Sequence, residues 1–233
     1  MIRNFIFSIF FFSGIVFISI IFLPSLFFPK QVVLFGGKLM GYWTSFCLKS
    51  FLSVKISVKG KENIVSNKKF FIAASHQSMF ETFYLQTIFN SPVFILKKEL
   101  LSIPIFGWYL KKIGSISIKR GKVSRDNLGF FDDISFMVNN SNRPLIIFPQ
   151  GTRVPPSERP KFKKGASKIY EKLGICCQPV AINSGFVWPK NGKKKSNKTI
   201  TISILETIPS GLDKKNFIQI LEKNIYSELN LLN

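Results

Sequence analysis

Histidine is almost absent from this chain, and cysteine is scarce. The 233 residues contain one histidine, His76, and three cysteines, none of which form a Cys-x-x-Cys pair. This set cannot build a zinc site of the usual kind or a disulfide framework, so we expect no metal and a reducing, cytoplasmic setting. Any imidazole chemistry must fall on His76, since no other side chain ordinarily titrates near neutral pH.

Acidic residues are also few. Lys and Arg total 33 against 12 Asp and Glu, which gives a formal net charge of +21 at pH 7. Such an excess indicates a polyanionic partner, either nucleic acid or an anionic bilayer surface. Phe alone contributes 26 residues, and this hydrophobicity beside the charge favours the bilayer. The alternative is that the richness in Lys and Asn reflects biased base composition.

Charge is missing altogether from residues 4–28, a run dominated by Phe, Ile, Val and Leu. The run exceeds the roughly 20 residues that cross the hydrocarbon core of a bilayer. Its exit, Leu26 to Lys30, lacks the small residues of a signal-peptide cleavage site, so we expect the segment to be retained. Only Arg3 precedes the run and several lysines follow it. The positive-inside rule therefore predicts a cytoplasmic (inner) membrane protein with its body facing the cytoplasm.

The next stretch, residues 32–54, mixes apolar residues with Lys38 and Lys49. It suits an interfacial amphipathic helix or the second arm of a re-entrant hairpin, and the sequence leaves both open. We predict that residues 1–53 form a membrane-anchoring segment and that residues 54–233 form a separate domain.

Short β-rich runs alternate with helical stretches throughout residues 54–233. The expected strands are 54–58, 70–74, 93–96, 115–118, 144–148, 179–182 and 199–205. The expected helices are 78–89, 104–113, 127–138, 168–173 and 217–232. This alternation predicts an α/β fold, a mixed sheet covered by helices, with the N-terminal hydrophobic helical segment attached.

His76 follows the apolar strand expected at 70–74, and chemistry in such sheets collects where strands end and helices begin. Glu81 comes five residues later. Five residues of a regular helix turn about 500°, so the two side chains can meet only if His76 lies on the strand-to-helix turn. Glu81 would then orient the imidazole. The alternative is a structural histidine that caps the helix.

Two further segments end in cations. Gly114 to Gly121 is a strand that finishes with Lys119 and Arg120, and Phe148 to Arg153 is a strand that enters a glycine turn. Backbone N–H groups and a planar guanidinium in such a turn can hold a phosphate. Each arginine, taken alone, could also be a solvated strand end.

Taken together, four ordered blocks within about residues 55 to 210 resemble the 1-acyl-glycerol-3-phosphate acyltransferase family. The blocks are His76 to Glu81, similar to the family's His-x4-Asp motif; Gly114 to Gly121; Phe148 to Arg153, similar to Phe-Pro-Glu-Gly-Thr-Arg; and Gln178 to Asn183, similar to the Val-Pro-Val block. The chain departs from the family twice, with Glu81 in place of Asp and Gln150 in place of Glu.

The resemblance implies that residues 54–233 are a catalytic domain that transfers a fatty acyl group from acyl-coenzyme A or acyl-carrier protein. The acceptor would be the sn-2 hydroxyl of 1-acyl-glycerol-3-phosphate (lysophosphatidic acid), the product phosphatidic acid, and no cofactor would be required. The implied roles are as follows: His76 as general base with Glu81 behind it; Arg120, Gly151, Thr152 and Arg153 on the phosphate; and Gln150, Lys119 and Pro179 as further substrate contacts. The expected partners are these two substrates and the lipid surface, without nucleic acid.

Two other functions remain open at this point. A sister O-acyltransferase could act on another lysolipid such as a lyso-ornithine lipid, whose lack of phosphate would make the arginines less necessary. A non-enzymatic, membrane-anchored basic binding protein would explain the charge and the anchor, but it would not explain the four ordered blocks.

Overall fold

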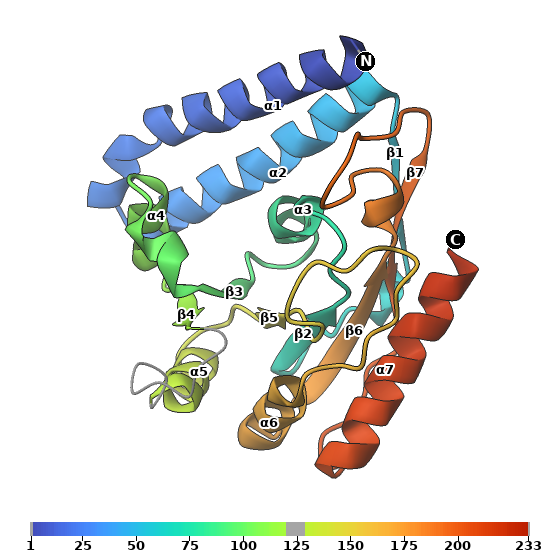
Figure 1. Ribbon diagram of the computed structural model, residues 1–233. Helices are drawn as coiled ribbons and strands as arrows, with labels where there is room; N and C mark the ends of the chain where they lie inside the picture. The colour runs from blue at the N-terminus through green and yellow to red at the C-terminus, as the bar shows by residue number, and fades with distance from the viewer. Residues whose placement is uncertain (1, 120–128, 233) are drawn as a thin grey trace.

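The computed structural model describes residues 2–119 and 129–232, and these residues build a seven-stranded sheet in the order β1-β7-β6-β2-β5-β3-β4 (Figure 1). The strands are β1 (Lys55–Lys59), β2 (Phe70–Ala74), β3 (Val93–Lys97), β4 (Ile116–Ile118), β5 (Leu145–Ile147), β6 (Cys176–Ile182) and β7 (Thr199–Ile204). All neighbours are parallel except β6 and β7, which are antiparallel. The predicted mixed sheet is confirmed.

Helices connect and cover these strands. They are α1 (Ile2–Ile21), α2 (Lys30–Leu52), α3 (Phe80–Ile88), α4 (Phe106–Lys112), α5 (Phe130–Asn139), α6 (Lys164–Leu173) and α7 (Lys214–Leu231), with short 3-10 turns that include η1 (Leu23–Phe27), η3 (Lys98–Ser102) and η5 (Ser184–Phe186). The last helix begins three residues before its apolar stripe, because the side chain of Asp213 accepts hydrogen bonds from the N–H groups of Lys215 and Asn216.

The central strands divide the interior into two cores. Along β2, Phe71 and Ala73 point into one hydrophobic cluster, whereas Ile72 and Ala74 point into the other. Successive side chains of a strand face opposite sides, so a continuous apolar run serves a sheet covered on both faces. Helices α5, α6 and α7 cover the first face, and α1, α2 and α3 cover the second (Figure 1).

The first two helices form a hairpin that packs on the second face of the sheet. Helix α1 ends at Ile21, η1 turns the chain, and α2 returns beside α1 as one continuous helix (Figure 1). The Arg3 guanidinium closes the open end, since it donates to the carbonyl of Phe51 (3.1 Å) and the hydroxyl of Ser53 (2.7 Å). Within the described residues, α1 is the one helix long and apolar enough to cross a membrane.

The topology brings three segments to one edge of the sheet. Strand β2 lies between β5 and β6, and all three run parallel. Their carboxyl ends therefore meet, and so do the residues that follow them: His76 after β2, residues 148–154 after β5, and η5 after β6. Open α/β sheets place their ligand sites at this edge.

Candidate active site

His76 lies on the turn between β2 and α3, outside the helix, which begins only at Phe80. This is the position that the five-residue spacing required if His76 and Glu81 were to meet. Nδ1 of His76 is 3.4 Å from Oε2 of Glu81, and within the described residues it has no hydrogen-bond partner. The imidazole is 15% exposed and stacks on Phe148, with 4.0 Å between ring centroids. The pair is thus brought together with one face of the imidazole covered and part of it open.

Glu81 is fully buried in the first turn of α3. A buried carboxylate needs several donors, and this one accepts hydrogen bonds from the backbone N–H groups of Gln77 (3.2 Å) and Ser78 (3.1 and 3.0 Å). The hydroxyl of Ser184 donates to the same carboxylate. These donors hold the charge in place beside the imidazole, so the longer side chain of Glu in place of Asp still meets the histidine.

The backbone of His76 is held by the third block. Its N–H donates to Oε1 of Gln150 (2.7 Å), and its carbonyl accepts from the N–H of Val154 (2.8 Å). Gln150 is only 3% exposed, and the hydrogen bond that it accepts comes from the backbone of His76. Gln150 therefore lies behind the histidine.

A cavity of about 560 Å³ opens beside the imidazole. Its wall is mostly apolar and comes from α2, α3, β3 and α4, with Val33, Met40, Phe83 and Leu110 among the lining side chains. Three cations, Lys97, Arg153 and Lys190, line the same cavity. Among residues 2–119 and 129–232, no group of three or more His, Cys, Asp or Glu side chains could hold a metal ion.

Of the residues expected to contact the substrate, some line the cavity and others lie elsewhere. Thr152 and Arg153 line the cavity beside His76, after a turn in which Gly151 has a φ of +74° that only glycine adopts easily. Lys119 is exposed after β4, and Arg120 lies outside the described residues. Pro179 is buried within β6, where it pairs with Ala73 of β2.

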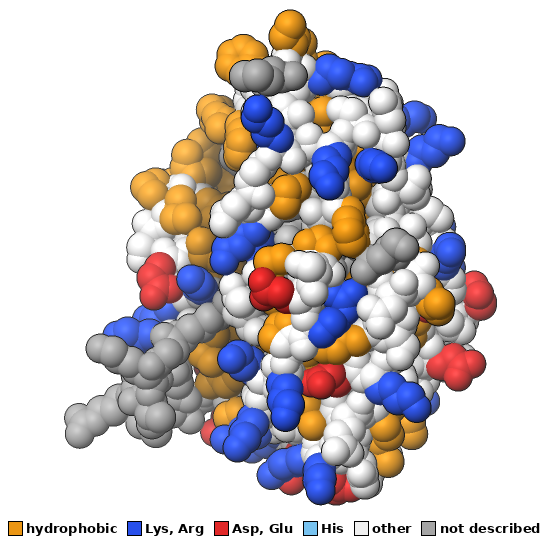
Figure 2. Space-filling model, turned by 45° about the vertical axis from the view of Figure 1, so that its right-hand side comes forward, with side chains coloured by type: hydrophobic (Ala, Val, Ile, Leu, Met, Phe, Trp, Pro, Cys, Tyr) orange, Lys and Arg blue, Asp and Glu red, His pale blue; other side chains and the backbone are white. Residues whose placement is uncertain are grey.

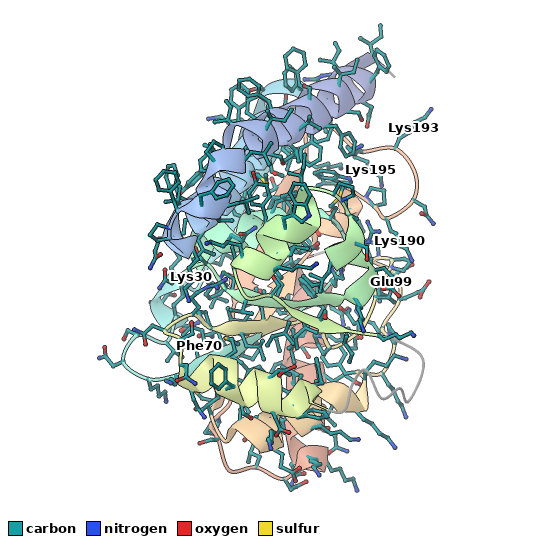
Figure 3. The ribbon with its side chains drawn as sticks, turned by 90° about the vertical axis from the view of Figure 1, so that its left-hand side faces the viewer. Lys30, Phe70, Glu99, Lys190, Lys193 and Lys195 are labelled. Atoms are coloured by element: carbon teal, nitrogen blue, oxygen red, sulfur yellow. The ribbon has the colours of Figure 1, made fainter. Side chains whose placement is uncertain are left out.

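Three residues of the site were not expected from the sequence: Lys97 and Lys190 on the cavity wall, and Ser184 on the carboxylate of Glu81. Lys97 ends β3 at the carboxyl edge, so its position after an apolar run was a readable signal. Lys190 belongs to a lysine-rich loop, and no pattern distinguished it from its neighbours there. Figure 3 shows Lys190, Lys193 and Lys195 following one another along this loop, on the same side of the view as Glu99 of η3.

The site combines a histidine–carboxylate pair with an apolar cavity that cations line, at the carboxyl edge of a mixed α/β sheet. This arrangement suits an α/β protein in which a base acts on an amphiphilic molecule. In a comparison with known protein families, the model described as Acyltransferase matches residues 55–183. This match spans more than half of the chain. The protein therefore belongs to the acyltransferase family, and the resemblance seen in the sequence is confirmed.

Among curated proteins, the chain is 34% identical to the 1-acyl-sn-glycerol-3-phosphate acyltransferase of Pseudomonas aeruginosa, over 70% of this chain and 63% of that protein. It is 31% identical to the proteins of the same name from Saccharomyces cerevisiae and Helicobacter pylori, over 55% and 67% of their lengths. The matched segment thus spans less than two thirds of the first two relatives.

Among solved structures, the 1-acyl-sn-glycerophosphate acyltransferase of Thermotoga maritima has the same fold. The TM-score is 0.81 at 22% sequence identity, and the alignment covers 99% of this chain and 96% of that one. The similarity therefore includes the N-terminal hairpin as well as the sheet.

Proposed function

We propose that this protein transfers a fatty acyl group from an acyl thioester to the sn-2 hydroxyl of 1-acyl-glycerol-3-phosphate, which yields phosphatidic acid. The observation that carries the proposal is the cavity wall, where His76, with Glu81 behind it, and the cations Lys97, Arg153 and Lys190 all meet apolar side chains. A lysophospholipid has one part for each of these features: a hydroxyl for the base, a phosphate for the cations and a hydrocarbon chain for the apolar wall. The names of the curated relatives support the same acceptor.

In the proposed reaction, His76 is the general base. Because Nδ1 faces Glu81, the imidazole holds its proton on Nδ1 and leaves Nε2 free to accept one. Nε2 takes the proton of the acceptor hydroxyl as the oxygen attacks the thioester carbonyl. Glu81 stabilises the imidazolium formed. When the tetrahedral intermediate collapses, the C–S bond breaks and the leaving thiolate takes the proton back from the imidazolium.

The phosphate of the acceptor would be held by Arg153 with the turn at Gly151 and Thr152, and by Lys97 and Lys190 from neighbouring segments. Arg153 offers a planar fork for two phosphate oxygens, whereas the lysines act as point charges. Fixing the phosphate places the hydroxyl near Nε2, and placement of this kind can contribute several kcal/mol. The apolar wall from α2, α3 and α4 would contact an acyl chain of the substrates.

We also propose that the α1–α2 hairpin binds the membrane in which both lipids reside. The outer face of α1 exposes large apolar side chains, among them Phe5 (68%), Val16 (57%) and Phe17 (63%). In the view of Figure 2, hydrophobic side chains gather along the upper left of the molecule, while Lys and Arg are spread over much of the rest of the side in view. Both ends of the hairpin lie against the domain, since Asn4 donates to the carbonyl of Lys194 (2.8 Å) near the start of α1 and the hydroxyl of Tyr109 donates to the carbonyl of Ser19 (2.6 Å) near its end. This geometry favours entry from one side of the bilayer, the cytoplasmic side on the charge argument given above.

The test is acyl transfer by the protein in phospholipid vesicles, with a panel of lysolipid acceptors and with both acyl-coenzyme A and acyl-carrier protein. We expect transfer to lysophosphatidic acid, and we expect His76→Ala to lower turnover by at least about 10²–10⁴-fold, the usual contribution of general-base catalysis. Glu81→Gln should also be severely impaired, since an amide cannot stabilise an imidazolium.

Both variants should stay folded and membrane-bound. Near wild-type turnover of folded His76→Ala would refute the mechanism. A preference for an acceptor without phosphate, such as a lyso-ornithine lipid, would move the protein to the sister activity.

A further inference from the structure

The carboxylate behind His76 is held by a side chain from a distant part of the chain. The hydroxyl of Ser184 donates a hydrogen bond to Oε1 of Glu81, and both residues are fully buried. Ser184 opens η5, directly beyond the carboxyl end of β6. The chain His76–Glu81–Ser184 therefore joins the segment after β2 to the segment after β6, at the edge where the cavity lies.

The fold brings Ser184 this close through the residue that follows it. The N–H of Gly185 donates to Oε1 of Gln77 (3.1 Å). A Cβ atom at position 185 would lie 2.9 Å from Cβ of Gln77 and 2.9 Å from Cγ of Pro156. Only glycine permits this approach, so η5 lies directly against the His76 turn.

The Ser184 hydroxyl is not needed to hold η5 itself. The carbonyl of Ser184 accepts hydrogen bonds from the N–H groups of Val187 (3.0 Å) and Trp188 (2.8 Å), and the Gly185–Gln77 bond fastens the same turn. All of these use backbone atoms of η5, which alanine at position 184 would keep. What alanine would remove is the donor on Glu81.

The orientation of Glu81 matters because its last torsion is soft. The χ3 angle of glutamate has a broad, roughly two-fold distribution, so its oxygens are set by their partners. Oε1 accepts from the N–H groups of Gln77 and Ser78 and from the hydroxyl of Ser184, whereas Oε2 accepts from the N–H of Ser78 (3.0 Å) and lies 3.4 Å from Nδ1 of His76. Nδ1 is buried and has no hydrogen-bond partner among the described residues, so the orientation of the carboxylate decides whether Oε2 can serve as its acceptor.

We propose that Ser184 is a positioning residue: its hydroxyl fixes the Glu81 carboxylate, which in turn keeps His76 in the Nδ1–H tautomer with Nε2 free as the base. The catalytic consequence rests on the acyl transfer proposed above, but the tautomer can be measured without any substrate.

The kinetic arm compares Ser184→Ala with Ser184→Thr, which retains the hydroxyl. Loss of the hydrogen-bond partners behind metal-binding histidines typically lowers activity by about 10–100-fold, and we expect a loss of similar size in kcat for the alanine variant. The KM for each substrate should change little, because Ser184 does not line the cavity. Ser184→Thr should retain more activity than alanine. Ser167→Ala is the matched control, since its buried hydroxyl donates to the carbonyl of Lys164 in the same helix, α6.

The spectroscopic arm uses the fact that His76 is the only histidine. Protein labelled with ¹⁵N-histidine gives one pair of imidazole nitrogen signals. We expect the Nδ1–H tautomer in the unmodified protein and in Ser167→Ala, and a mixture of tautomers in Ser184→Ala. If the alanine variant does not fold, Ser184→Cys, which keeps the size but is a weak donor, takes its place in both arms.

A double-mutant cycle completes the test. If Ser184 acts through Glu81, then Ser184→Ala should add almost nothing to the kcat loss of Glu81→Gln. Fully additive losses, or an unchanged tautomer and kcat in folded Ser184→Ala, would overturn the proposal. If the unmodified protein is inactive on every lysolipid but Ser184→Ala still changes the tautomer of His76, the proposed function is refuted and the positioning role stands.

Discussion

At the scale of single residues, Gln150 accepts a hydrogen bond from the backbone N–H of His76, and an amide or a carboxylate oxygen can accept that bond equally well. Its buried place behind the histidine explains how this chain can differ from the family's glutamate without losing the His76–Glu81 pair. The acceptor, rather than the charge, is the feature that the geometry uses.

Gln150→Glu should therefore be tolerated, with kcat/KM for the acceptor within a few-fold of the unmodified protein. Gln150→Met, which matches the size of glutamine but is at best a very weak acceptor, should leave a buried N–H without a good partner. Such a loss destabilises by about 1–3 kcal/mol, and it should also reduce kcat. Thermal unfolding and steady-state kinetics of both variants check this. Collapse of Gln150→Glu alone would mean that the amide itself is required.

Arg153 carries the second prediction at this scale. Arg153→Ala should raise the KM for lysophosphatidic acid by about one to two orders of magnitude, since a charge-assisted hydrogen bond contributes roughly 1.5–3 kcal/mol. The KM for the acyl donor should change far less. Arg153→Lys should rescue only partly, because a point charge lacks the fork. We expect the same pattern for Arg120→Ala, on sequence grounds alone.

Arg159 is the matched control for Arg153. It lies in the same connection and is also partly buried, but its guanidinium bonds the carbonyl of Pro156 (2.5 Å) and the side chain of Asn230 (3.1 Å). Its loss should leave the acceptor KM unchanged. Equal acceptor kinetics for all folded alanine variants would move the phosphate site elsewhere.

At the scale of elements, α1 has two faces with different partners. Phe7 and Phe11 are buried against Trp188, with ring centroids 5.2 and 5.0 Å apart, and Phe11 also meets Phe83 of α3 at 5.7 Å. Phe5 on the same helix is 68% exposed. An apolar helix of this kind thus contributes to the core on one side and, in our proposal, to membrane binding on the other.

Phe11→Ala should lower the free energy of unfolding by about 3–5 kcal/mol, the usual cost of removing a buried phenylalanine ring. Phe5→Ala should leave the unfolding transition in detergent almost unchanged and weaken vesicle binding. Thermal unfolding and vesicle flotation of the two variants separate these effects. Equal destabilisation by both substitutions would contradict the assignment of the two faces.

At the scale of the whole molecule, a net charge of +21 accompanies the exposed apolar face of the hairpin. Cations near an anionic bilayer each contribute about 1 kcal/mol, and salt screens that attraction beyond about 8–10 Å. Apolar insertion has no such salt dependence. The two contributions to membrane binding can therefore be separated by ionic strength.

Binding to vesicles that contain anionic phospholipid should weaken as salt rises from 0.05 to about 0.5 M, while binding to neutral vesicles should be weaker and nearly independent of salt. Flotation with a salt series measures both. Identical binding to the two kinds of vesicle would show that the charge reflects composition and has no role at the membrane.

Much of this protein could be predicted from its sequence, because local patterns carry the information. Period-two alternation and short apolar runs predict the strands, and they have counterparts in β1 to β7. The helical turn of about 100° per residue already required His76 to lie outside the helix that holds Glu81, and it does. One histidine left no other choice for an imidazole base.

Other features depend on tertiary contacts that no local pattern encodes. Ser184 meets Glu81, and Gln150 meets His76, across separations of 103 and 74 residues. The order of the strands decides these meetings, since β2 lies between β5 and β6. Likewise, the apolar run at 4–28 reads as a simple span, but its return through η1 and its packing on Trp188 make it part of the core. A sequence shows which side chains are apolar or charged, whereas only the packed chain determines which distant groups each of them contacts.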